Sequence, residues 1–208
     1  MPTHKSFEYC SLHYLNQWLT YDMDYCLTLA KGDESEKLAI LKNAGSFYRV
    51  ARNLPTEHEE EEGVVRYKPV LDIIDCLERS QFEKNPVEEI LKIAEKISSK
   101  YGGRNVLSLT TKFLWIKIKQ PILIYDSQAR IALGTKNGDL DAYYAKWRKE
   151  FESNKEEIVD VCSKLPDMNK YAINQEIGTK EVIKNISDEL WFHERVFDIF
   201  LWSKGQNG

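Results

Sequence analysis

Hydrophobic positions recur at steps of three and four along most of this 208-residue chain. That spacing places side chains on one face of an α-helix, whereas no segment shows the strict alternation of a strand. The pattern therefore predicts an all-α fold without internal repeats. The first apolar stripe runs from Tyr9 to Ala30 and contains Leu12, Leu15, Leu19, Met23, Cys26 and Leu27.

Capping and stop residues divide the rest of the chain into further helices. Asn85 and Pro86 are a capping residue and a first-turn proline, while Gly102 and Gly103 are typical of a helix end. The acidic stretch at 57–63 predicts an exposed loop, so we expect all 208 residues to form one domain whose two lobes meet there. The predicted helices cover Ser35 to Pro55, Pro69 to Leu77, Pro86 to Tyr101, Val106 to Ile118, Asp126 to Gly134, Leu140 to Leu165, and Ser187 or Asp188 to Leu201, with an irregular segment from Pro166 to Thr179.

Composition narrows the class of protein. A hydrophobic share of 42% and a charged share of 30% are ordinary for a globular domain. No apolar run is long enough to cross a bilayer, so we expect no membrane partner. The N-terminal stretch MPTHKSFEYC lacks the apolar core of a signal peptide, and we therefore expect a cytoplasmic protein.

Cysteines and histidines show no metal-binding pattern. The cysteines lie far apart without a CxxC pair, which argues against a disulfide framework, a zinc site and an iron–sulfur cluster. The histidines have no metal-ligand spacing either. We expect no metal and no cofactor. The residues concerned are Cys10, Cys26, Cys76 and Cys162, with His4, His13, His58 and His193.

Charge is distributed unevenly along the chain. The net charge is −4, which argues mildly against nucleic-acid binding. Residues 96–125, however, contain no acidic side chain, and the basic face that they predict is compatible with DNA contact. The alternative is that these side chains are solvated helix ends. The basic residues in this stretch are Lys96, Lys100, Arg104, Lys112, Lys117 and Lys119.

Lys112 lies inside an apolar helical pattern. At about 100° per residue, its face of the helix contains Ser108, Leu109, Trp115 and Ile116, and the opposite face is also mostly apolar. Burial disfavours the ammonium form of a lysine and lowers its pKa, and a neutral amine is a nucleophile. Lys112 is thus a candidate nucleophile. The alternative is a lysine whose ammonium group reaches water over Trp115.

Asp126 stands where the next predicted helix begins, fourteen positions after Lys112 (126 − 112). An aspartate directly before a helix is usually an N-cap that accepts bonds from the following backbone N–H groups. A capped, ionised carboxylate can also stabilise the positive charge that develops on a sugar during glycosidic cleavage. The structural and the functional interpretation of Asp126 are therefore compatible.

The stretch SLTTKFLWIKIKQPILIYDSQARIAL, from Ser108 to Leu133, resembles the helix-hairpin-helix DNA glycosylases. It is most similar to small bacterial proteins related to 8-oxoguanine DNA glycosylase, which carry a similar S-K-F-L … P … I-Y-D-S pattern. The resemblance covers Val106 to Leu133, and DIFLW at Asp198–Trp202 is similar in style. It implies a two-lobed helical bundle with a cleft between the lobes.

The resemblance implies roles for named residues. Lys112 would attack the anomeric carbon and form a Schiff base, and Asp126 would support the charge. The family's glycine-flanked turn is missing directly before Lys112, and Gly102 with Gly103 is our candidate for it. Contacts to double-stranded DNA are expected from Lys100, Arg104, Ser108, Thr110 and Thr111, and contacts to an everted base from Trp115, Tyr125, Ser127, Arg130, Arg49 and Arg52, with Phe47, Tyr48 and Trp18 as further aromatic candidates.

Several alternatives stay open at this point. Asp126 could act alone with water and leave an abasic site, without a lysine adduct. The excised base could be an oxidised purine such as 8-oxoguanine, or a hypermodified phage base such as glucosylated hydroxymethylcytosine, which would indicate phage defence. The rival from another class is a non-catalytic all-α interaction or regulatory protein. We expect a monomer in either case.

Overall fold

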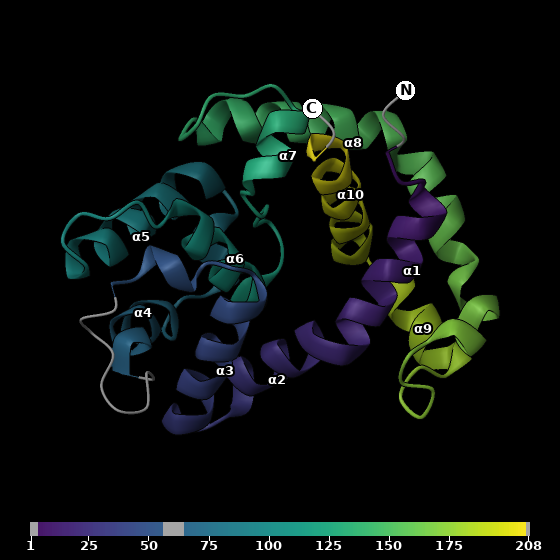
Figure 1. The fold of residues 1–208 in the computed structure, drawn as a ribbon, viewed down its shortest axis with the longest axis horizontal. Coiled ribbons are helices and arrows are strands. Elements are labelled where there is room, and N and C mark those ends of the chain that lie inside the picture. Colours follow the sequence, from purple (N-terminus) through teal and green to yellow (C-terminus); the bar gives the residue numbers. More distant parts are fainter. Residues whose placement is uncertain (1–3, 56–64, 207–208) are drawn as a thin grey trace. The chain divides into compact units, whose positions relative to one another are not determined.

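The computed structural model describes residues 4–55 and 65–206 (Figure 1). Over these ranges the chain is helical and contains no strand, which confirms the predicted all-α class. The predicted loop and lobe boundary at 57–63 lie outside the described residues. The chain divides into two compact units with breaks at 23/24 and 125/126. Unit 1 comprises residues 1–23 and 126–208, and unit 2 comprises residues 24–125.

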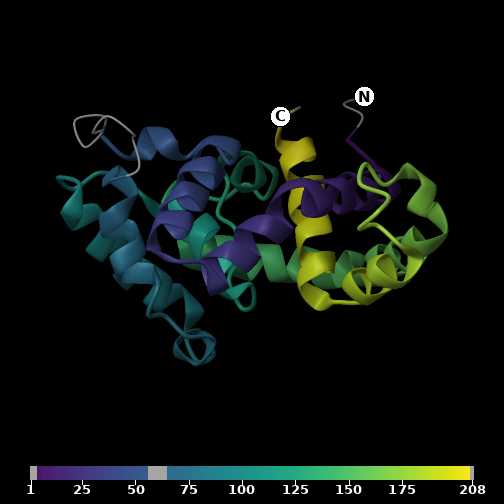
Figure 2. The ribbon, with the colours of Figure 1, turned by 90° about the horizontal axis from the view of Figure 1, so that it is seen from below.

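Unit 1 is organised around its last helix, α10 (Leu190–Gly205). Contacts join α10 to α1, α7 and α8, and Figures 1 and 2 show it beside α1. Its aromatic face supplies much of the core, where Phe197 packs against Trp147 and Phe151. The other helices of unit 1 are α1 (Phe7–Gln17), α7 (Ser127–Ala132), α8 (Leu140–Ser163) and α9 (Lys180–Ser187), with a 3-10 segment at Leu165–Tyr171.

Unit 2 is organised around its helix α6 (Leu107–Ile118), which is buried along most of its length. Helices α4 and α5 contact it, and α3 packs on α4. The predicted start of α5 is confirmed, because Asn85 accepts a bond from the Glu88 backbone N–H and Pro86 lies in the first turn of this helix. The helices are α3 (Glu34–Phe47), α4 (Lys68–Ile74) and α5 (Pro86–Lys100), with 3-10 turns at Ala51–Asn53, Val65–Tyr67 and Arg79–Phe82.

The first predicted apolar stripe is helical, but one of its residues, Leu27, is exposed and not buried. Residues Tyr9–Ala30 fall in α1, a π-helical turn at Trp18–Asp22, and α2 (Met23–Lys31). Leu15 and Leu19 are buried as expected, whereas Leu27 is 51% exposed. A π turn adds a residue to the repeat, so the face that follows it no longer obeys a period of 3.6.

Several helix boundaries differ from the prediction. Asp33, and not Ser35, opens α3, because its side chain and that of Glu36 form a reciprocal capping box. That helix ends at Phe47, and Arg49 adopts a left-handed conformation with φ 56°. The last helix, α10, begins only at Leu190, and Ser187, one of its two predicted start positions, instead ends the preceding helix α9. The helix at Pro69 also ends early, at Ile74.

Candidate active site

Lys112 is buried in α6, where it is 3% exposed. Its Nζ donates to the Ser108 hydroxyl at 2.8 Å and, more weakly, to the Tyr125 carbonyl at 3.4 Å. The first bond confirms that residues 108 and 112 share a helix face. Both oxygens are neutral acceptors, so these two bonds can be made equally well by a neutral amine, which keeps two N–H groups and a lone pair.

The segment after α6 is tied back to that helix. α6 ends at Ile118, and Lys119 has φ 60°, which turns the chain away before Pro121. Residues 122–125 belong to no helix and are buried, and the Tyr125 backbone N–H donates to the Thr111 hydroxyl at 3.1 Å. Tyr125 is thus held through both its N–H and its carbonyl, and Asp126 is the next residue in the chain.

Asp126 caps α7, as predicted. Its backbone is extended, and its carboxylate accepts a bond from the Gln128 backbone N–H at 2.9 Å. The other end of α7 is closed by Gly134, whose φ is 59°. The Arg130 guanidinium donates to the Thr135 carbonyl at 2.8 Å, so this predicted base-contacting residue holds the turn after its own helix. Ser127 is exposed beside the cap.

A buried ion pair lies in the same unit as Asp126. The Asp198 carboxylate accepts from the Trp147 indole N–H and from the Arg195 guanidinium, both at 2.8 Å. Burial raises the pKa of Asp198, and the negative charge of Asp126 acts in the same direction. Burial also raises the pKa of Tyr143, with smaller contributions from Asp198 and Asp126. The charge of Asp126 therefore acts on this buried cluster, a feature that the sequence analysis did not predict.

Four predicted basic residues belong to one region of unit 2. Lys100 and Arg104 flank the turn between α5 and α6, where Gly102 and Gly103 have φ 68° and 81° and an added Cβ would meet no atom within 4 Å. One hydrogen bond joins this region directly to the 3-10 turn at residues 51–53, since Asn53 donates to the Asn105 carbonyl at 3.0 Å. Arg66 provides an indirect link, because its carbonyl accepts from the Tyr101 hydroxyl and its guanidinium donates to the Ala51 carbonyl. We call the exposed residues Arg49, Arg52, Lys100 and Arg104 the basic edge.

Two predicted DNA contacts have a different role in the structure. Thr110 and Thr111 are fully buried, and their hydroxyls donate to the carbonyls of Val106 and Ser108. The apolar pattern continues around α6, so these threonines satisfy their hydroxyls within the helix. Ser108 is only partly buried, and its hydroxyl accepts the bond from Lys112.

The predicted aromatic residues are mostly part of the two cores. Trp115 and Tyr125 are 1% and 5% exposed in unit 2. Phe47 and Tyr48 pack edge to face and are half-buried. Trp18 lies in unit 1, where its ring packs against Trp191. Among these residues, Phe47 and Tyr48 keep the most accessible ring surface.

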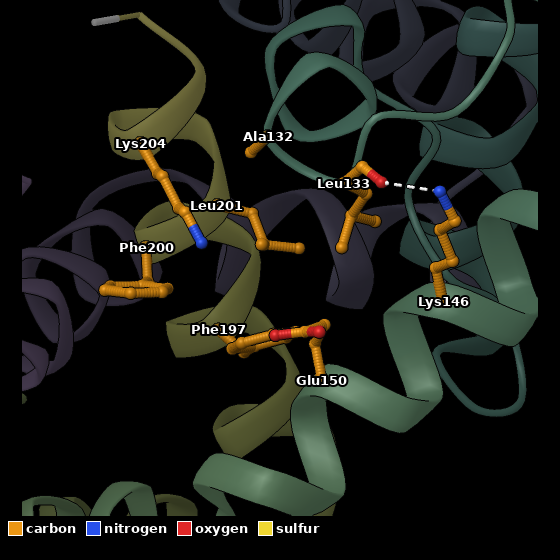
Figure 3. Close-up of a pocket in the computed structure, with 8 residues that line it drawn as sticks. All are labelled: Ala132, Leu133, Lys146, Glu150, Phe197, Phe200, Leu201 and Lys204. Carbon is orange, nitrogen blue, oxygen red and sulfur yellow. Dashed lines mark hydrogen bonds between the residues drawn. The ribbon is translucent and has the colours of Figure 1, made fainter. Parts of the chain in front are cut away.

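Two pockets lie within single units, and neither contains Lys112 or Asp126. The first has a volume of about 100 Å³ and lies where the end of α7 meets α8 and α10 (Figure 3). This volume is well below the roughly 300–1,000 Å³ of small-molecule sites. The second, of about 340 Å³, lies in unit 2 along an ion-pair network with Lys37, Lys68, Asp72 and Asp75.

No family model, curated protein or solved structure matches this chain. Within the described ranges, no group of three or more histidine, cysteine or acidic residues could hold a metal ion. No helix there is both long and apolar enough to span a bilayer. The function must therefore be argued from the two candidate residues and their surroundings.

Proposed function

We propose that this chain is a DNA glycosylase of the helix-hairpin-helix type that excises a modified base, with Lys112 as its nucleophile. The observation that carries the proposal is the burial of the Lys112 side chain in α6, where this residue is 3% exposed. Removing an amine from water disfavours its charged form, and the neutral form is the nucleophile. A lysine kept at this position only for solubility would be exposed.

The chemistry needs only the amine, the substrate and a proton. The lone pair of Nζ forms a bond to C1′ while the bond from C1′ to the base nitrogen breaks, and the base leaves with the bonding pair and takes up a proton. Loss of a proton from Nζ and opening of the C1′–O4′ bond, with O4′ protonated, then give a Schiff base. This intermediate allows strand cleavage after base loss.

Asp126 supplies the negative charge in this proposal. As the base departs, positive charge develops on C1′ and O4′, and an ionised carboxylate stabilises it most strongly where water is scarce. The bond from the Gln128 N–H fixes one Asp126 oxygen. Asp126 directly follows Tyr125 in the chain, and the Tyr125 carbonyl accepts a bond from Lys112.

The basic edge supports double-stranded DNA as the partner. Its four arginine and lysine side chains are exposed and come from two segments, 42–55 and 96–125, that contain no acidic residue. Hydrogen bonds hold these segments together through Asn53 and Asn105. Arginine and lysine arranged in this way neutralise phosphates without reading sequence. Arg49 and Arg52 are thereby better placed for the duplex backbone than for the base.

The substrate class follows from the need to evert the base. A modified or damaged base is expelled from the stack at lower cost than a normal one, and the pocket then reads its altered edge. We propose an oxidised purine such as 8-oxoguanine or a hypermodified cytosine of phage DNA. These two classes differ greatly in size, so base release distinguishes them directly.

The experiment is borohydride trapping on duplexes that carry normal, oxidised or glucosylated hydroxymethylated bases, with released bases identified by mass. We expect a covalent adduct and a released base for one modified duplex. Lys112→Gln should abolish the adduct. The matched control is Lys117→Gln, because Lys117 lies on the same helix but pairs with Asp75. That control should form the adduct normally.

The same assay separates the rival functions. If Lys112→Gln still releases base and Asp126→Asn does not, the enzyme uses water and is monofunctional. If the wild-type chain releases no base from any duplex and both variants match it in DNA binding, the glycosylase proposal fails and a non-catalytic interaction protein is favoured.

DNA binding by the basic edge is tested separately from chemistry. In Arg52→Glu/Arg104→Glu, duplex affinity should fall, and the slope of log K against log salt should decrease by about two, roughly one for each lost phosphate contact. Lys155→Glu/Lys184→Glu makes the same change in net charge at exposed ion pairs of unit 1 and should bind normally. Equal loss in both variants would show that only net charge matters.

A further inference from the structure

The backbone of α10 lies close to the backbone of α7 at Gly205. A Cβ added there would lie 2.6 Å from the Gln128 carbonyl carbon and 3.0 Å from its Cα, and it would overlap the Gln128 carbonyl oxygen. All three atoms belong to the backbone, so no rotation of a side chain could relieve the clash. The φ angle of Gly205 is not positive. Glycine is therefore required here because a side chain has no room, and not because of the backbone conformation.

The neighbour of Gly205 is the residue that holds the candidate carboxylate. The backbone N–H of Gln128 donates to Asp126 at 2.9 Å, and its carbonyl faces Gly205. The backbone N–H and carbonyl of Gln128 therefore link the Asp126 side chain to the α10 backbone. A displacement of this turn would move the cap with it.

α7 depends on such support because it has only six residues. An isolated helix of this length is not stable in water, so its position is set by the elements that it packs against. Its far end is held by Lys146, whose Nζ donates to the carbonyls of Leu133 and Gly134 at 3.2 and 3.0 Å. Figure 3 shows the bond to Leu133 and, beside it, Leu133 with Phe197 and Leu201 of α10.

We infer that Gly205 is a positioning residue for Asp126, with the α10 backbone supporting the first turn of α7 so that the carboxylate is held in one place. The catalytic consequence rests on the proposed function. The contact itself concerns only the folding of unit 1. Lys146 and Gly205 then hold the two ends of α7, one by hydrogen bonds and the other by close packing.

The first test needs no DNA. In the wild-type protein, an NMR cross-peak between the Gly205 Hα protons and the Gln128 Hα is expected. Its absence would overturn the inference. In Gly205→Ala, the Gln128 amide should exchange with solvent at least about tenfold faster, as it should in Asp126→Ala, where the acceptor of the N–H is removed. An unchanged Gln128 exchange rate in folded Gly205→Ala would equally overturn it.

The second test measures catalysis. Gly205→Ala should lower kcat by about 100-fold, because misplacing a reacting group by about 1 Å has that effect. KM for the duplex should stay unchanged, since the basic edge lies in unit 2. The matched control Gln206→Ala alters the next, exposed residue and should keep full kcat. A normal kcat in folded Gly205→Ala would contradict the positioning role.

Failure of the inference and failure of the proposed function give different results. If no duplex is a substrate but Gln128 exchange responds to Gly205→Ala, the proposed function is wrong and the structural inference stands. If the wild type excises a base and neither kcat nor exchange responds, the enzyme proposal stands and Gly205 has no positioning role.

Discussion

The two units bury charged residues in different ways. In unit 2, the Lys112 amine lies in an apolar helix and donates to a hydroxyl and a carbonyl. In unit 1, Arg195 and Asp198 are buried together and joined by a 2.8 Å ion pair. The ion pair stabilises the fold of unit 1 as long as both partners are present, whereas the two bonds from Lys112 to neutral oxygens do not require the charged form of the amine. The proposed function uses the second arrangement and not the first.

The largest expected effect comes from removing the amine while keeping its shape. Lys112→Met should lower base excision by at least roughly 10⁴-fold, since a nucleophile has no substitute. Stability should stay equal or increase by about 1 kcal/mol, because a flexible apolar side chain suits this interior better than an amine does. Single-turnover excision and urea unfolding give the two values. If Lys112→Met still excises the base, or if it loses much of its unfolding free energy, the difference described between the buried charges of the two units does not hold.

The opposite pattern is expected for the ion pair of unit 1. Arg195→Met leaves the Asp198 carboxylate buried without this partner and should cost about 3–5 kcal/mol of unfolding free energy. Urea unfolding measures the loss. Lys184→Met, at an exposed ion pair of α9, is the control and should have no measurable effect. If Arg195→Met is as stable as the wild type, the pair does not support unit 1 in the way described.

A smaller effect separates the two roles of Asp126. Asparagine is as good an N-cap as aspartate, so Asp126→Asn should change stability by less than about 0.5 kcal/mol, whereas Asp126→Ala should cost about 1 kcal/mol. Excision should fall by about 10²-fold or more in both variants, because both lose the charge. The control Asp139→Asn alters the equivalent cap of α8 and should be fully active. Normal excision by Asp126→Asn would limit this residue to capping.

The sequence predicts the surroundings of Lys112 better than those of Asp126. Apolar residues on all sides of α6 are visible in the sequence, and burial follows from them. The cap at Asp126 is equally local, because it involves only the Gln128 N–H two residues later. The support behind that cap is not local, since Gly205 lies 77 positions further along the chain (205 − 128). No periodicity within one segment reveals such a contact.

The errors in the predicted helices have local physical causes. The spacing of Leu27 fits the buried face of a regular α-helix, but the π turn at Trp18–Asp22 shifts the repeat and leaves this side chain exposed. The sequence pattern does not predict the start of α9. Thr179, which caps this helix, is the last residue of the segment predicted to be irregular. The resemblance implies DNA contacts for Thr110 and Thr111, whereas in the structure their hydroxyls donate to carbonyls within the helix.

The smallest effect expected is a pH dependence of stability that originates in unit 1. His193 is buried in α10, with Nε2 2.7 Å from the Ser187 carbonyl. Burial lowers the pKa of His193 and outweighs the opposite influence of that carbonyl and of Asp188. The folded protein therefore binds the proton less readily than the unfolded chain, whose histidine titrates near pH ~6.5.

Stability attributable to His193 is then fully present above pH about 6.5 and is lost as the pH falls below that value, by at most about 1.4 kcal/mol per pH unit. Urea unfolding of wild type and His193→Gln at pH of about 7.5, 6.5 and 5.5 measures it, and the variant should lose less stability on acidification. His13, whose pKa burial also lowers, remains in both proteins and cancels in the difference. Parallel curves for the two proteins would show that the proton on His193 is bound equally in both states, and that α10 does not make unit 1 sensitive to acid.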